Sequence, residues 1–399
     1  MSNIFSFIYI DDLNDKSNKK NNITTVCKKF DDSFKSLLQI SENKGIHLNL
    51  ENEEIFNNFI KSNFIKKIPN IIAITNGKNL NKKELLKKFI ELKKTLKNSK
   101  IININISDIN FDKFEDQEIF NKFIDCESFE VNNSSINENI LFSAFYPKTL
   151  KKISLSRVKI ITNILLKIKP TKSYFKKINI CESDISTETL IKFIKLNSQS
   201  IRKLHLTRLN NVDYKSKELI KQIKGIKNLD TLDIYYNSSN TNSNSYKDIT
   251  KLYIEIIKTR KLKKLFINYL NFDGINKENI SKSLKNLKNL ESLSFYGNHF
   301  NEVIKNIESL QKLKCSFINY DFSNKENNLK PYFKNLKILK IDRLFNFKAV
   351  IEITPITPSL IKLEICIYNK HKNLEKHDIE SIVNTLNKVI YKNIECRNE

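Results

Sequence analysis

A short phrase that recurs through the second half of the chain constrains the fold more than any other feature of the sequence. It reads apolar-x-x-apolar-x-apolar, and its copies begin at Leu150, Phe175, Ile201, Leu229, Leu262, Leu290, Leu310, Leu336 and Leu360. The steps between these first residues are 25, 26, 28, 33, 28, 20, 26 and 24. Self-similarity at such a period indicates a chain that stacks one structural unit on the next.

Each phrase predicts a short strand, and the segments between phrases predict helices. Apolar residues at the fourth and sixth positions of the phrase have a period of two, which is typical of a strand with one buried face. Segments such as TETLIKFIKLN, KELIKQIKGI and KLYIEIIKTR instead have helical spacing, often with a Ser or Thr before them as a cap. Strands joined by such crossovers form a parallel sheet.

Weaker copies extend the pattern towards the N-terminus and raise the expected number of strands to about fourteen. They are Cys126/Phe129/Val131, Ile101/Ile104/Ile106, Pro69/Ile72/Ile74, Gly45/Leu48/Leu50 and Phe5/Ile8/Ile10. We therefore predict divergent repeats and a cap in residues 1–100, clear repeats in 101–373, and a capping helix and tail in 374–399, with the helix over Leu374–Ile390. Polar residues predict exposed loops at 14–23 and 236–247.

The phrase and its period resemble the leucine-rich repeat, in a divergent form of the ribonuclease-inhibitor-like or F-box-associated type. The heavy use of Lys, Asn and Ile looks like that of an AT-rich genome. The resemblance implies an α/β horseshoe solenoid with parallel strands on its concave face and helices on its convex face. The family consensus continues to an Asn or Cys three residues past the third apolar position. Asn237 and Asn298 meet it, but other copies place Val158, Leu209, Leu270 or Leu344 there, so we expect apolar packing in place of the family's side-chain ladder.

The third, fifth and seventh positions of the phrase are the candidate binding residues, because the resemblance places them on the concave surface. The third position supplies a ladder of lysines, the fifth supplies a histidine, a phenylalanine and a lysine, and the seventh supplies two tyrosines. They are Lys152, Lys177, Lys203, Lys264 and Lys312, then His205, Phe266 and Lys314, then Tyr235 and Tyr296. These side chains are suited to binding an acidic protein surface. Alternatively, the lysines are simply solvated at the exposed start of each strand, and a loop covers the aromatic side chains.

The formal net charge of +25 would suit a polyanionic partner such as RNA or a ribosome. Only six of the basic residues are arginines, however, and arginine is the residue that bidentate phosphate and base recognition favours. The first hypothesis is therefore a non-enzymatic scaffold that binds a protein with an acidic surface. An RNA- or ribosome-associated protein and a secreted interaction protein remain the alternatives.

The sequence carries no recognisable catalytic or cofactor motif. It lacks a phosphate-binding GxxxxGK[ST], and five glycines in all leave no dinucleotide fingerprint. The five histidines do not pair with one another or with cysteines at metal-binding spacing. We expect no enzyme activity, no cofactor and no metal. The six separated cysteines, the absence of a signal peptide and the lack of a membrane-length apolar run favour the cytoplasm.

Overall fold

The computed structural model describes most of the repeat strands and their neighbouring helices. The residues described are 46–61, 70–76, 80–96, 100–112, 126–142, 149–162, 174–235, 243–258, 262–268, 283, 287–296, 307–316, 334–344, 359–368 and 391–397. The chain divides into two compact units, unit 1 at Met1–Ile185 and unit 2 at Ser186–Glu399. Each unit is described by itself.

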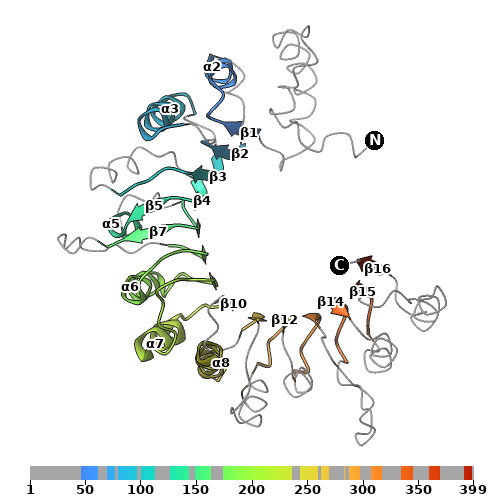
Figure 1. Ribbon diagram of the computed structural model, residues 1–399. Helices are drawn as coiled ribbons and strands as arrows, with labels where there is room; N and C mark the ends of the chain where they lie inside the picture. The colour runs from blue at the N-terminus through green and yellow to red at the C-terminus, as the bar shows by residue number, and fades with distance from the viewer. Residues whose placement is uncertain are drawn as a thin grey trace, which may run out of the picture. The chain divides into compact units, whose positions relative to one another are not determined.

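Unit 1 contains a parallel sheet whose strands follow the order of the chain, as Figure 1 shows. Its described strands are β1 (Ile46–Asn49), β2 (Asn70–Thr75), β3 (Lys100–Ser107), β4 (Cys126–Asn132), β6 (Lys152–Ser156) and β8 (Lys177–Cys181). The helices α2 (Glu53–Lys61) and α3 (Lys82–Thr95) connect the first three strands. Consecutive strands pair in register, so equivalent positions of the phrase stand side by side.

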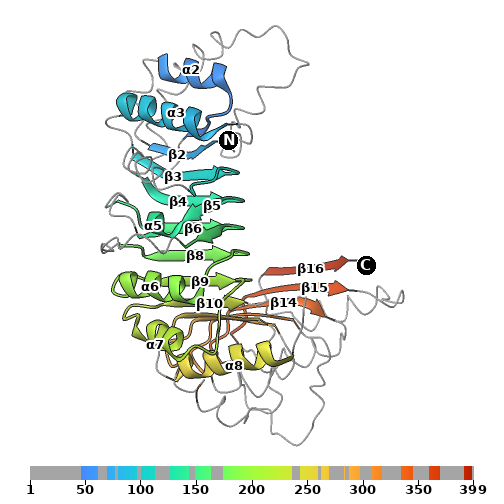
Figure 2. The ribbon, with the colours of Figure 1, turned by 60° about the vertical axis from the view of Figure 1, so that its left-hand side comes forward.

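Unit 2 repeats this arrangement with another set of parallel strands in chain order. They are β9 (Lys203–Thr207), β10 (Thr231–Tyr235), β11 (Lys264–Asn268), β12 (Ser292–Tyr296), β13 (Lys312–Ser316), β14 (Ile338–Leu344), β15 (Lys362–Tyr368) and β16 (Tyr391–Arg397). Three helices, α6 (Thr187–Asn197), α7 (Lys217–Gly225) and α8 (Ser243–Ile257), lie on one side of its sheet (Figure 2). All three predicted helical segments are confirmed.

The repeating phrase determines where the strands begin. In each of the nine clear copies the strand starts at the third residue of the phrase, for example at Lys203 in the copy that starts at Ile201. The first, fourth and sixth residues are buried wherever their burial is described, and in this copy Ile201, Leu204 and Leu206 are fully enclosed. At about 1.5–3 kcal/mol for each buried Leu or Ile, these positions supply the main driving force for stacking.

Several crossovers in unit 1 begin with extended segments. The short strands β5 (Ser135–Asn137) and β7 (Lys159–Ile161) pair in parallel. Single bridges join Phe111 to Ile136 and Lys159 to Asp184. The helix after β5, α5 (Glu138–Leu141), has four residues. These segments satisfy their backbone groups by pairing with one another, and the remaining parts of the same crossovers, 113–125, 143–148 and 163–173, lie outside the described residues.

The predicted phrase at Pro69/Ile72/Ile74 is displaced by two residues in the structure. Ile71 pairs with Ile101, and Ile74 pairs with Ile104, so Ile74 occupies the fourth position and Asn76 the sixth. Asn76 is only 2% exposed, and its amide exchanges two hydrogen bonds with the backbone of Ser107, at 2.7 and 2.8 Å. A buried amide at an apolar position broke the pattern on which the prediction relied.

Serine side chains replace the expected apolar packing at two copies of the consensus Asn/Cys position. The hydroxyl of Ser134 accepts from the backbone N–H of Ile109 and donates to the carbonyl of Asn132. The hydroxyl of Ser183 likewise accepts from the backbone N–H of Val158 and donates to the carbonyl of Cys181. Each serine thus links its own strand end to the preceding repeat, whereas the predicted apolar residues Val158 and Leu209 are indeed buried at their copies.

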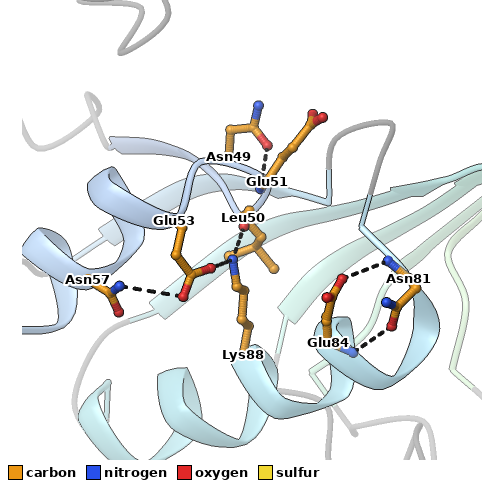
Figure 3. A network of polar contacts seen from close by, with 8 residues as sticks. All are labelled: Asn49, Leu50, Glu51, Glu53, Asn57, Asn81, Glu84 and Lys88. Atoms are coloured by element: carbon orange, nitrogen blue, oxygen red, sulfur yellow. Dashed lines mark hydrogen bonds and ion pairs between the residues drawn. The ribbon is translucent and has the colours of Figure 1, made fainter.

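A polar network centred on a buried lysine joins α2 to α3 near the start of unit 1 (Figure 3). The ammonium of Lys88 donates to the carbonyl of Leu50 at 2.6 Å and lies 2.5 Å from Glu53 Oε2. Its hydrogen bond lowers the pKa of Glu53 below the ordinary value. Asn81 and Glu84 form a capping box at the start of α3. The network therefore fixes the turn after β1 against α3.

The C-terminal tail contains a strand that the sequence analysis did not predict. Tyr391–Arg397 forms β16 and pairs with β15 along its whole length. The predicted capping helix over Leu374–Ile390, the predicted loop at 14–23 and the Phe5 phrase lie outside the described residues. The predicted loop at 236–247 is shorter than expected, because α8 already begins at Ser243.

Candidate partner-binding face

The third, fifth and seventh residues of each phrase lie on the sheet face opposite the buried positions. We call these residues in unit 2 the open face; its described side chains include Lys203, His205, Thr207, Thr231, Asp233, Tyr235, Lys264, Phe266, Ser292, Ser294, Lys312, Lys314, Ile338, Lys340, Asp342, Lys362 and Glu364. In β9 the alternation is plain, because Leu204 and Leu206 are buried while Lys203 is exposed. The alternation follows from the two-residue period of a strand.

Three lysines of the predicted ladder stand exposed on alternate strands. They are Lys203 on β9, Lys264 on β11 and Lys312 on β13. The small side chains of Thr231 and Ser292 occupy the intervening strands in the same register. Within the described part of the chain none of the three lysines has an ion pair within 4.0 Å. Their charges are therefore available to a partner.

Other lysines of the open face form ion pairs with acids on the adjacent strand or on their own strand. Lys314 lies 2.8 Å from Asp342, and Lys362 lies 2.7 Å from Glu364, which also pairs with Lys340. A hydrogen bond from Lys340 and a second, weaker contribution from the hydrogen bond of Lys362 lower the pKa of Glu364. The predicted site residue Lys314 is thus part of an internal charge network.

The two predicted lysines of unit 1 lie in a different environment. Lys152 and Lys177 are neighbours in register on β6 and β8, and Lys152 pairs with Glu130 on β4. The positions around them carry neutral polar residues joined in cross-strand pairs. Asn132 donates to Asn105 at 2.7 Å, and Asn179 donates to Ser154 at 2.8 Å.

A histidine, an aspartate and a phenylalanine meet at the fifth position of three consecutive strands. His205 Nδ1 lies 3.2 Å from Asp233 Oδ2, and the His205 and Phe266 ring centroids are 6.1 Å apart. Asp233 Oδ1 is buried and has no hydrogen-bond partner among the described residues. All three side chains are half-buried. They form a compact patch with an aromatic wall, a carboxylate and an imidazole.

A buried tyrosine beneath this patch fixes the two strands that carry it. The hydroxyl of Tyr253, on α8, accepts from the N–H of Ile234 at 2.8 Å and lies 2.6 Å from the carbonyl oxygens of Ile234 and Phe266. Burial, reinforced by the charge of Asp233, raises the pKa of this phenol well above its ordinary value. The phenol therefore stays protonated and ties β10 to β11.

The remaining predicted aromatic residues lie at the seventh position. The ring of Tyr235 has the Arg208 guanidinium 5.4 Å from its centroid. The backbone of Tyr296 ends β12, but its side chain lies outside the described residues. Cys181 is half-buried at a seventh position of unit 1, while Cys126 and Cys315 are buried. Burial raises the pKa of the Cys315 thiol well above its ordinary value.

The predicted site residues are cations and aromatics, and the acids that pair with them were not predicted. Asp233 and Glu364 stand at the fifth position beside His205 and Lys340 of the adjacent strand, and Asp342 stands two residues beyond the register partner of Lys314. Aligning the phrases position by position would have placed each acid near its cation, because the sheet stays in register between these strands. The signal was present in the sequence as opposite charges at nearby positions of successive copies.

Every clear copy of the phrase forms a parallel strand with its first, fourth and sixth residues directed into the core wherever their burial is described. The fold is a divergent leucine-rich-repeat fold. This holds for both units. In the described part of the chain, α2, α3 and α6 to α8 supply helices to leucine-rich-repeat crossovers, and the paired extended segments β5 and β7 open two crossovers of unit 1.

Comparison with known proteins finds matches among solved structures. No family model matches the chain, and no curated protein matches it. The chain is similar to the leucine-rich repeat-containing protein LegL7 from Legionella pneumophila, with 14% identity, a TM-score of 0.38, and coverage of 86% of this chain and 98% of LegL7. It is also similar to the plant peptide hormone receptor RGFR1 in complex with RGF2, with 12% identity, a TM-score of 0.31, and coverage of 84% of this chain and 48% of the receptor.

No helix among the described residues is long and apolar enough to cross a membrane. The described residues contain no group of three or more His, Cys, Asp or Glu side chains placed to hold a metal ion.

Proposed function

We propose that this protein is a non-enzymatic scaffold of the cytoplasm whose open face binds a protein partner with an acidic surface. The observation that carries the proposal is the set of exposed, unpaired lysines beside the His205–Asp233–Phe266 patch. Lysines around a half-buried aromatic side chain combine a charged rim with an apolar anchor. Such a combination is typical of protein interfaces, where a few central residues supply most of the binding energy.

The distribution of charge supports a protein partner that contacts a limited part of the face. The ion pairs of β13 to β15 already engage Lys314, Lys340 and Lys362 with Asp342 and Glu364. The high net charge of the chain therefore does not extend evenly over the open face. A partner that follows the phosphate backbone of RNA would gain little from lysines that are already paired.

The test is capture of partners by the tagged full chain from its own cell lysate, at about 50 and about 200 mM salt, with proteins and RNA both identified. The open-face variant combines Lys264→Glu with Phe266→Ala. The control variant combines Lys217→Glu with Lys251→Glu, which change exposed lysines on α7 and α8. The wild type and the control should retain one protein that the open-face variant loses.

Two outcomes would contradict the proposal. Retention of every captured protein by the open-face variant would place the binding surface elsewhere on the molecule. Capture of RNA or ribosomal particles that are released at the higher salt concentration, and lost in the open-face variant, would replace the protein partner by a nucleic acid.

A further inference from the structure

The exposed lysines of the open face have a regular spacing along a line across the strands. Lys203, Lys264 and Lys312 occupy the third position of β9, β11 and β13, so each is separated from the next by one intervening strand. Neighbouring strands lie about 4.8 Å apart. The backbone positions of successive lysines are therefore about 9.6 Å apart.

The side chains between these lysines are short. Thr231 is buried and Ser292 is half-buried, and both are much shorter than lysine. Phe266 and His205 flank the line at the fifth position. A chain that crosses the strands at the third position would meet the three exposed lysines in turn, with an aromatic wall beside it.

A polyproline II segment matches this spacing better than the regular alternatives do. It has three residues per turn and rises about 3.1 Å per residue, so every third side chain points the same way at intervals of about 9.3 Å. In a β-strand the side chains on one face recur at about 6.6 Å, and in an α-helix side chains seven residues apart recur at about 10.5 Å. Over two intervals the helix would run ahead of the lysines by about 1.8 Å, and polyproline II would fall short by about 0.6 Å.

We propose that the open face binds an extended polyproline II segment with an acidic residue at every third position, laid across β9 to β13. The proposal rests on the proposed function and specifies the partner's conformation and charge spacing. Each carboxylate would pair with one of the three exposed lysines. The residue types between the acids would be set by contact with Phe266.

The experiment measures binding of two fluorescein-labelled peptides to the full chain by fluorescence anisotropy. One peptide contains four Glu-Pro-Pro repeats, and the other has the same composition with its glutamates in one block. Both favour polyproline II and carry the same charge, so only the spacing differs. The repeat peptide should bind about tenfold more tightly, as expected for three weak ion pairs formed together.

Matched variants connect the preference to the three lysines. Lys203→Glu, Lys264→Glu and Lys312→Glu combined should abolish the preference, and the corresponding neutral glutamine variant should reduce it without reversing the charge. A control with Lys217→Glu, Lys227→Glu and Lys251→Glu, all exposed and outside the open face, should keep it. Circular dichroism establishes that each variant is folded.

The outcomes separate this inference from the proposed function. Equal binding of the two peptides, or a preference that survives in both lysine variants, would overturn the inference. In that case the lysate partner could still depend on Phe266 and Lys264, and the scaffold proposal would stand. Tighter binding of a short polyadenylate than of either peptide, lost in the same variants, would overturn the inference in favour of a nucleic acid.

Discussion

At the scale of single residues, buried polar side chains within or just after the phrase connect one repeat to the next. The hydroxyls of Ser134 and Ser183 and the amide of Asn76 each satisfy backbone groups of a neighbouring repeat. Buried backbone groups need such partners, because an unsatisfied one costs more than a hydrogen bond normally contributes. These three residues therefore serve the role of the family's asparagine ladder.

Replacing Ser183 by alanine should destabilise unit 1 by about 1–3 kcal/mol, because the buried N–H of Val158 would lose its acceptor. Urea denaturation gives the change in the free energy of unfolding, and hydrogen exchange of the Val158 amide should accelerate most. Ser156→Ala, on the opposite face of the sheet, is the control and should have little effect. Unchanged protection of Val158 in Ser183→Ala would show that the hydroxyl is dispensable.

At the scale of elements, strands β13, β14 and β15 are linked by charges as well as by their backbones. Lys340 and Lys362 both bind the carboxylate of Glu364, and Lys314 binds that of Asp342. The Lys314–Asp342 and Lys340–Glu364 pairs connect side chains that are far apart in the sequence but lie on adjacent strands, whereas Lys362 and Glu364 lie on the same strand. The network therefore depends on the alignment of successive strands.

The lowered pKa of Glu364 makes the stability of these strands sensitive to acid. A carboxyl group whose pKa is lower in the folded state stabilises the fold above its unfolded pKa, near the ordinary value of 4.5, and this contribution is lost as the pH falls through the folded pKa. The wild type should therefore exceed Glu364→Gln in urea midpoint at about pH 6.5, and the difference should shrink at about pH 3.5. Glu188→Gln, on α6, is the matched control, and a difference that is constant with pH would refute the assignment.

At the scale of the whole molecule, the chain consists of repeats whose cores are completed by their neighbours. Each phrase of a unit contributes three apolar residues that are buried only when the adjacent strands are in place. In such arrays stability is close to a sum of terms for each repeat and for each contact between neighbours. Damage to one repeat should therefore remain local within its unit.

Replacing Leu204 by aspartate places a carboxylate in the core of unit 2, where Leu204 is fully buried. Hydrogen exchange should lose protection in β9, β10 and α6, while β14 and β15 keep theirs. Leu204→Met conserves the side-chain volume and should leave the whole pattern unchanged. Simultaneous loss of protection from β9 through β15 would instead show that unit 2 unfolds as one cooperative body.

The candidate site could be predicted from the sequence only in part. The positions of Lys203, Lys264, Lys312, His205 and Phe266 on one face follow from the alternation within the phrase. Which lysines are neutralised does not follow from it, because that depends on the side chains of adjacent strands. Tyr253, which anchors the strands beneath the patch, lies on a helix, and its hydrogen bonds to Ile234 and Phe266 required the packed structure.

The sequence by itself determined the period of the repeat, the start of each clear strand and the parallel order of the strands. These features follow from apolar periodicity, which is a local property of the chain. Only the tertiary structure decided the register at Asn76, the extended crossovers of unit 1, the strand at Tyr391–Arg397 and the pairing of charges across strands. Each of these depends on hydrogen bonds or ion pairs between residues of different repeats, and such partners can be identified only when the repeats are stacked.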